Sequence, residues 1–264
     1  MPLFLRSPHV RRHGAAVLVA IIGTVVYSVW LPPSNDFAVQ HFRSALFRKA
    51  PFAIWSNQWF GGHHMPAYSL LAPIVGSVVG AVALGALSVL VGSLLGSLLV
   101  HSLHRSVAGL RRPELAGALL AVGLLSSLFG GRTTFLSGAA LGLAALCAAV
   151  RGTAVGTAAL ALASALSSPV AGVFLATIGL AVMLSKAWTR SVALGLVLPT
   201  MVPIVGMTVL FYEPGNFPFP LGGWAIAVAA VVIAFLVRRF AKPKTQLAGA
   251  GADGANFRMH PDVQ

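Results

Sequence analysis

The chain has 264 residues, of which 57% are hydrophobic and only 9% are charged, and its mean hydropathy is +0.87. Soluble domains carry about one quarter charged residues, so this composition excludes a soluble domain and is typical of a polytopic membrane protein. The net charge of +13 is distributed between apolar runs rather than gathered on one surface, so we do not expect nucleic-acid binding. The single cysteine, Cys147, lies within an apolar run and is expected to be a small buried hydrophobe.

The apolar runs predict an all-α fold, a bundle of about eight transmembrane helices at roughly 20 residues per crossing. The first run follows the basic leader MPLFLRSPHVRRHG and has no small-x-small cleavage site after it, so we expect an uncleaved anchor. In chain order, the predicted spans are about 15–31, 70–100, 115–129, 135–150, 153–166, 170–185, 192–210 and 224–237.

Several of these runs contain signals that interrupt a helix. The run 70–100 is too long for one crossing, so we expect a short interfacial helix before the second span, joined to it near Pro73 and Gly76. The runs 153–166 and 170–185 are separated by SSP and are short for full crossings. Pro199 and Pro203 predict a kink in the seventh span.

The distribution of basic residues predicts the orientation in the membrane. If the N-terminus is cytoplasmic, only four of the 18 Lys and Arg residues fall outside: Arg43, Arg48, Lys49 and Arg132. We therefore expect a multi-pass protein of the plasma membrane with both termini cytoplasmic. Residues 1–245 would form the transmembrane domain, and the Gly/Ala-rich residues 246–264 a disordered cytoplasmic tail.

The connector 32–69 is the only long one on the predicted outer side, and long connectors tend to carry function. In its first half, NDFAVQHFRSALFRKA places Val39, Phe42 and Leu46 on one helical face. This pattern predicts a basic amphipathic helix in the headgroup plane, with its polar side chains off the apolar face. These polar side chains are His41, Arg43, Arg48 and Lys49.

Few side chains on the predicted outer side are suited to acid–base chemistry. Of the five acidic residues, only Asp36 and Glu213 fall outside, and the imidazoles there are His41, His63 and His64. Asp36 has two interpretations that do not exclude each other, a general base and a member of the helix-capping sequence 34–36. Glu213, in FYEPGNFPFP, is interpreted as a turn residue at the water boundary.

The second half of the connector, WSNQWFGGHHMPAYS, is rich in rings and hydrogen-bonding groups. No third metal ligand accompanies His63 and His64 at suitable spacing, so we do not expect these histidines to hold a metal, and no cofactor is assigned. These histidines are interpreted either as polar loop contacts or as ligands of a substrate phosphate or sugar. The rings of Trp55, Trp59 and Tyr68 fit an interfacial aromatic belt, or alternatively stacking on a sugar ring or prenyl chain.

Asp36 just past the first span, followed by an amphipathic helix and IWSNQWFGGHHMPAYSLLAP, resembles the first outer loop of the polytopic membrane glycosyltransferases of the GT-C fold. The segments LFGGRTTFLSGAALGLAAL and ALSSPVAGVFLA are also similar to segments of such proteins. The resemblance implies a polyprenyl-phosphate-linked sugar donor on the outer membrane face and a glycan or lipid acceptor. It implies that Asp36 takes the proton from the acceptor hydroxyl, which attacks the anomeric carbon with inversion.

On the same interpretation, cations steady the departing lipid phosphate, with Arg132 best placed because it follows Gly130 and Gly131 at the outer end of a span. Arg132 is alternatively interpreted as an arginine that snorkels to the membrane interface. The other candidates are Arg43, Arg48 and Lys49. A lateral groove open to lipid should then contain Asp36 and Arg132. Family members usually have a longer bundle and often a second acidic residue, whereas here Asn35 precedes Asp36, so an inactive relative or partner subunit is also compatible with the sequence.

Two other classes remain open. A small-molecule or lipid transporter would use the kinked span 192–210 and the interrupted pair around SSP, although no acidic or basic residue lies in the middle of a predicted span. A structural subunit of a membrane complex is favoured by the small residues of the spans between 115 and 185, which allow close helix packing. The expected partners are membrane lipids and possible membrane protein subunits.

Overall fold

The computed structural model describes residues 8–58, 62–104, 112–185 and 188–212, together with four isolated positions nearer the C-terminus. The chain divides into two compact units, Met1–Glu213 and Pro214–Gln264. The four isolated positions belong to the second unit and are helical: Ala225, Val228, Ala229 and Val232. The predicted eighth span and the predicted tail therefore lie largely outside the described residues.

The first unit is helical apart from one short hairpin, so the predicted all-α class is confirmed for the part of the chain that the structure describes. Its helices are α1 (Pro8–Trp30), α2 (Asn35–Lys49), α3 (Leu71–Val79), α4 (Ala81–His104), α5 (Pro113–Phe129), α6 (Thr133–Val150), α7 (Ala154–Ser167), α8 (Pro169–Ser185) and α9 (Arg190–Leu210). The hairpin pairs β1 (Trp55–Ser56) with β2 (His63–His64) in antiparallel register.

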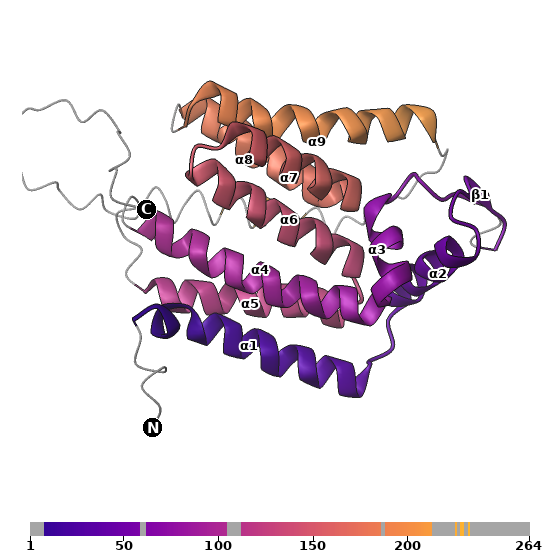
Figure 1. The fold of residues 1–264 in the computed structure, drawn as a ribbon, viewed down its shortest axis with the longest axis horizontal. Coiled ribbons are helices and arrows are strands. Elements are labelled where there is room, and N and C mark those ends of the chain that lie inside the picture. The colour runs from indigo at the N-terminus through magenta and orange to yellow at the C-terminus, as the bar shows by residue number, and fades with distance from the viewer. Residues whose placement is uncertain are drawn as a thin grey trace, which may run out of the picture. The chain divides into compact units, whose positions relative to one another are not determined.

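Within this unit the long helices run side by side, and α2, α3 and the hairpin gather at one end of them (Figure 1). α4 packs on α1, α5 and α6, while α7 packs on α6 and α9. One buried cluster forms around Tyr27, Val89 and Leu136, and a second around Ala161 and Leu196. Because α6 contributes to both clusters, it joins the N-terminal helices to the C-terminal ones.

Small residues allow these helices to approach closely, as the sequence indicated. A Cβ atom added at Gly138 of α6 would lie 2.7 Å from Ser168 Cβ and 2.8 Å from Ala171 Cβ. Such backbone proximity is the usual means of packing helices in lipid, where the hydrophobic effect between helices is absent. Cys147 is buried on α6, as expected, and its thiol donates to the Leu95 carbonyl oxygen at 3.5 Å.

The helix boundaries follow the predicted interruptions closely. α7 ends at Ser167 and α8 begins at Pro169, because proline needs no N–H partner in the first helical turn. Pro199 and Pro203 lie inside the continuous helix α9, and the kink expected there stays a prediction. Among the described residues, four helices have the length and composition to cross a membrane, and they are α1 from His13, α4, α6 and α9.

The joint before the second span was wrongly predicted. Pro73 and Gly76 lie inside α3, and the break comes at Gly80, whose φ of +88° ends α3 before α4 begins at Ala81. Pro73 is tolerated because it lies in the first turn of α3. Gly76 is required for a different reason, since the Ser44 hydroxyl of α2 packs where a Cβ atom would stand. A short helix does precede the long one, as expected.

Candidate functional site

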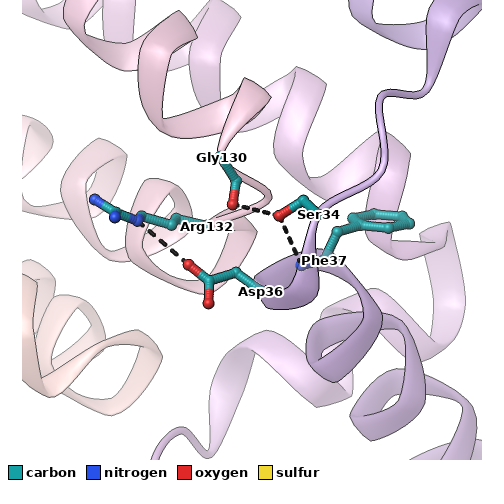
Figure 2. A network of polar contacts seen from close by, with 5 residues as sticks. All are labelled: Ser34, Asp36, Phe37, Gly130 and Arg132. Carbon is teal, nitrogen blue, oxygen red and sulfur yellow. Dashed lines mark hydrogen bonds and ion pairs between the residues drawn. The ribbon is translucent and has the colours of Figure 1, made fainter.

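The N-terminus of α2 is fixed to the turn between α5 and α6. Ser34 is the N-cap of α2, and its hydroxyl accepts the Phe37 N–H at 3.5 Å and donates to the Gly130 carbonyl oxygen at 2.6 Å (Figure 2). Gly131 follows with a φ of +76°, and a Cβ atom there would lie 2.5 Å from both Phe37 N and Ser34 Oγ. The sequence GGRTT is therefore a docking turn for α2 as well as a helix break.

Two predicted site residues meet beside this turn. Arg132 Nε and Asp36 Oδ2 are 3.3 Å apart, and the two side chains point toward each other from the N-cap of α6 and the first turn of α2 (Figure 2). Their side chains are 65% and 55% exposed, so the pair itself contributes only about 0–1 kcal/mol to stability. Arg132 meets the carboxylate through Nε, and its two Nη groups lie on the side away from Asp36 (Figure 2).

The capping interpretation of residues 34–36 is assigned by the structure to Ser34. Asp36 lies in the first turn of α2, where a carboxylate also interacts favourably with the positive end of the helix dipole. The Asp36 carboxylate thus has two favourable neighbours, the helix terminus and Arg132. Both interactions are compatible with a structural role and with a catalytic one.

α2 packs on the bundle through polar side chains. Its buried residues are Gln40, Arg43 and Ser44, whereas Val39, Phe42 and Leu46 are half-buried. The Gln40 side-chain oxygen accepts a hydrogen bond from Thr134 of α6, which is also buried. The amphipathic pattern was recognised in the sequence, but the polar side of α2 faces protein at these positions, because the bundle offers hydroxyl and carbonyl partners there.

Arg43 is 5% exposed and holds the end of the connector against α2. Its guanidinium donates to the Met65 carbonyl oxygen and, at 3.4 Å, to the Ser69 carbonyl oxygen. It also lies 5.4 Å from the centre of the Tyr68 ring, within cation–π range. Arg43 therefore lies on the protein-packed side of α2, unlike His41, Arg48 and Lys49, with which it was grouped in the sequence.

Tyr68 is electrostatically linked to the Asp36–Arg132 pair. Partial burial raises the pKa of the Tyr68 hydroxyl, and the negative charge of Asp36 raises it further, while the positive charges of Arg43 and Arg132 oppose the increase. One side chain of the aromatic-rich connector thus responds to both members of the pair. The structure thus joins Asp36 to Arg132 at the start of α2 and Arg43 to Tyr68 further along the helix, and the charges of the first pair act on the Tyr68 hydroxyl.

The hairpin explains most of the remaining side chains in WSNQWFGGHHMPAYS. Trp55 faces His64 across the strand pair, with ring centroids 4.7 Å apart in an edge-on arrangement, and the Trp55 indole N–H donates to Asn57 Oδ1 at 2.6 Å. The His64 ring also lies 5.6 Å from the ring of Phe211. Gly62 has a φ of +132°, and the Trp55 ring occupies the space of an added Cβ atom.

The remaining predicted site residues are placed as follows in the hairpin and on α2. His63 and His64 are successive strand residues, so their side chains leave opposite faces. Among the described residues, no group of three or more His, Cys, Asp or Glu side chains is placed to hold a metal ion. Trp59 and Glu213 lie outside the described residues. His41, Arg48 and Lys49 are exposed on α2.

Two cavities adjoin α2. The first, of about 410 Å³, has apolar walls apart from Arg43 and Ser69 and lies between α2, the connector and α3. The second, of about 640 Å³, lies between α2, the end of α1 and the joint of α3 and α4. Neither cavity has Asp36 or Arg132 in its lining, so neither is the expected groove around that pair.

Several residues that build this region were missed from the sequence. Ser69 Oγ donates to the Ser167 carbonyl oxygen at 2.7 Å, and the hydroxyls of Ser137 and Ser167 are 2.6 Å apart. The Leu70 N–H donates to the Leu166 carbonyl oxygen at 2.9 Å, so the end of the connector is bound to the end of α7. The interrupted SSP segment was the available signal, because a helix end leaves carbonyl groups that need donors.

Comparison of the chain with protein-family models, curated proteins and solved structures finds no match.

Proposed function

We propose that the chain is a membrane glycosyltransferase of the GT-C type that uses a polyprenyl-phosphate-linked sugar donor at the end of the bundle carrying α2. The supporting observation is the 3.3 Å contact between Asp36 and Arg132, which are 96 residues apart in the sequence. From the sequence, Asp36 was predicted to be a base and Arg132, independently, to be a phosphate ligand. Their contact supports assigning the two roles to one site.

In the proposed step, Asp36 acts on the acceptor hydroxyl and Arg132 acts on the leaving phosphate. The acceptor hydroxyl oxygen forms a bond to the anomeric carbon, and its proton moves to the Asp36 carboxylate. The bond between the anomeric carbon and the phosphate oxygen breaks, and the electron pair leaves with the polyprenyl phosphate. The Nη groups of Arg132, which face away from Asp36, would donate to that phosphate as its negative charge increases.

The proposal includes about eight crossings with both termini cytoplasmic. Helix α7 has 14 residues and is about 21 Å long, while α5 and α8 have 17 residues each and are about 26 Å long. The hydrocarbon core is about 30 Å thick, so these three helices cross only with local thinning or with help from flanking residues. Their burial against longer helices, which α7 shows by packing on α6 and α9, supports such a placement.

A second candidate is a structural subunit of a membrane complex. It is favoured by the engagement of Asp36 with Arg132 outside both cavities, and by the Ser34–Gly130 hydrogen bond that fixes α2 beside them. On this alternative the ion pair only positions α2. A single variant that keeps the fold separates the two candidates.

The test is sugar transfer in membranes that contain Asp36→Asn and are supplied with polyprenyl-phosphate sugars and an acceptor. Loss of a general base lowers rates by about 10²–10⁴-fold, and we expect a loss in this range with unchanged membrane insertion. The matched control is Asp36→Glu, which keeps the carboxylate and should retain measurable transfer. Undiminished transfer by Asp36→Asn would remove the catalytic assignment, and absence of transfer by the wild type would favour the structural subunit.

A further inference from the structure

The cavity of about 640 Å³ beside α2 has one polar wall and one apolar wall. The polar wall comes mainly from α2, where His41, Ser44 and Arg48 lie at positions i, i+3 and i+7 and therefore share one helix face. The opposite wall comes from the last turn of α3 and the first turns of α4. Its apolar lining residues are Val79, Ala81, Val82, Ala83, Ala86 and Leu87.

Arg48 is held in place over this cavity. Its Nε donates to the Ser77 carbonyl oxygen of α3 at 2.9 Å, which spans the gap between α2 and α3. The bond uses one of the five N–H donors of the guanidinium and fixes its plane, so the terminal Nη groups remain suited to an anion. Arg48 is exposed, and no Asp or Glu is among the described residues that line the cavity.

The serine hydroxyls that line this cavity already donate hydrogen bonds within their own helices. Ser44 Oγ donates to the Gln40 carbonyl oxygen at 2.9 Å, and Ser28 Oγ of α1 donates to the Thr24 carbonyl oxygen at 2.8 Å. Both hydroxyl protons are thus used within their own helices. The donors available to a bound anion are the guanidinium of Arg48 and the imidazole of His41.

The hollow itself results from small residues at the joint of α3 and α4. A Cβ atom added at Gly80 would meet no atom of the described residues within 4 Å, and Ala81, Ala83 and Ala86 present only methyl groups. Leu87, which also lines this wall, is 51% exposed. An apolar chain that leaves the cavity along α4 would cover this exposed surface.

The cavity also lies at a suitable depth. It is lined by Ser28, near the end of the candidate span His13–Trp30, and by Ala81, at the start of the candidate span Ala81–His104. Two candidate spans therefore reach a common boundary at this cavity. Lipid phosphates lie just outside the hydrocarbon core, where such span ends are found.

From these observations we infer that this cavity binds an anionic membrane glycerophospholipid. Arg48 and His41 would donate to the phosphodiester, and one acyl chain would lie along Val82, Ala86 and Leu87 of α4. Charge complementarity favours an anionic headgroup, because the polar wall carries a guanidinium and no carboxylate. The apolar wall favours a lipid over free phosphate, which would leave that wall uncovered.

This inference does not depend on the proposed transferase. Arg48 follows Asp36 by twelve positions on α2, a separation of about 18 Å along the helix axis. The lipid site and the Asp36–Arg132 pair can therefore be altered independently. Arg48, first considered as a ligand of a sugar-donor phosphate, is assigned here to a resident lipid.

Lipid binding is tested by thermal unfolding of the purified full chain in a nonionic detergent, with the melting temperature Tm measured after addition of dioleoylphosphatidylglycerol. A ligand that binds only the folded state raises Tm. We expect this lipid to raise the Tm of the wild type, and dioleoylphosphatidylcholine or inorganic phosphate to give less than half of that increase. Equal stabilisation by inorganic phosphate would overturn the lipid assignment in favour of a simple anion site.

Two variants locate the effect. Arg48→Gln should at least halve the Tm increase, whereas Lys49→Gln, which removes the same charge from the next residue outside the cavity lining, should leave it unchanged. Ala83→Leu fills the apolar wall and should also reduce the increase, with Ala86→Leu as a second filling variant. Equal responses of Arg48→Gln and Lys49→Gln would show a nonspecific effect of charge and overturn the proposed site.

Discussion

The Ser34 hydroxyl donates to the Gly130 carbonyl oxygen at 2.6 Å, so a residue before α2 is joined to the turn that follows α5. The same oxygen accepts the Phe37 N–H and caps α2. One hydroxyl therefore fixes both the start and the position of the helix that carries Asp36. The geometry of the candidate site depends on this link.

Replacement of Ser34 by Ala removes the cap and the contact with Gly130 together. Loss of an N-cap side chain costs about 0.5–2 kcal/mol, and we expect a lower Tm of the purified protein in detergent. Ser185→Ala is the control, because this exposed hydroxyl donates to the Val182 carbonyl oxygen within its own helix. Equal Tm values for the two variants would contradict the importance of the link.

Gly131→Ala should destabilise the protein more strongly. The φ of +76° is unfavourable for alanine, and the added methyl would lie 2.5 Å from Phe37 N and Ser34 Oγ. Gly123→Ala in α5 is a matched control, because no atom of the part of the chain that the structure describes lies within 4 Å of its added Cβ. Alanine is also the better helix former by about 1 kcal/mol. We expect opposite shifts of Tm, and a Gly131→Ala variant as stable as the wild type would exclude the close approach.

Arg43→Met should loosen the end of the connector. The substitution removes the donors to the carbonyl oxygens of Met65 and Ser69 but keeps an apolar chain of similar length. We expect amide hydrogens of residues 62–70 to exchange several-fold faster, measured by mass spectrometry, with Lys49→Gln as the control. Unchanged exchange would mean that Arg43 does not hold this segment.

The Tyr68 hydroxyl reports on the charges of the candidate site. Its pKa is raised by partial burial and by Asp36 and lowered by Arg43 and Arg132. We therefore expect Asp36→Asn to lower the pKa of Tyr68 and Arg132→Gln to raise it. The measurement is the ultraviolet absorbance of phenolate during titration, with the Tyr68→Phe protein subtracted, and shifts in the reverse directions would contradict the arrangement.

The raised pKa of Tyr68 also makes the stability of the folded protein depend on pH. The folded state holds the phenolic proton of Tyr68 more tightly than the unfolded state does. The protonated hydroxyl therefore makes its full contribution to the free energy of unfolding below the unfolded pKa of about 10. This contribution is lost as the pH rises through the folded pKa. Tyr68→Phe should therefore show a smaller loss of stability above pH 10 than the wild type.

Most helix boundaries could be predicted because apolar runs are long and their interruptions are chemically distinct. The segments GGRTT and SSP separate helices as expected, and Ser34 caps α2. The joint at Gly80 was missed because Pro73 and Gly76 are also helix-interrupting residue types. The deciding property is the backbone conformation, which is left-handed at Gly80 and helical at Gly76, and residue type alone does not distinguish the two glycines.

The candidate site was predicted in its components and not in its contacts. Asp36 and Arg132 were selected from residue type and position, but periodicity carries no information on which loops meet. The burial of Arg43 and Gln40 was missed for a related reason. A polar residue on an amphipathic helix is expected to face water. The burial of Gln40 is favourable because Thr134 donates a hydrogen bond to it, and that of Arg43 because it donates to the Met65 carbonyl oxygen of the connector.

The charge exchange Asp36→Arg with Arg132→Asp tests the central claim most directly, by sugar transfer in membranes beside the two single variants. If Asp36 is the base and Arg132 the phosphate ligand, the exchanged pair restores Tm toward the wild-type value but leaves transfer at the level of Asp36→Asn. If the pair only positions α2, the exchanged protein recovers transfer together with Tm. Recovery of transfer would contradict a catalytic role for Asp36.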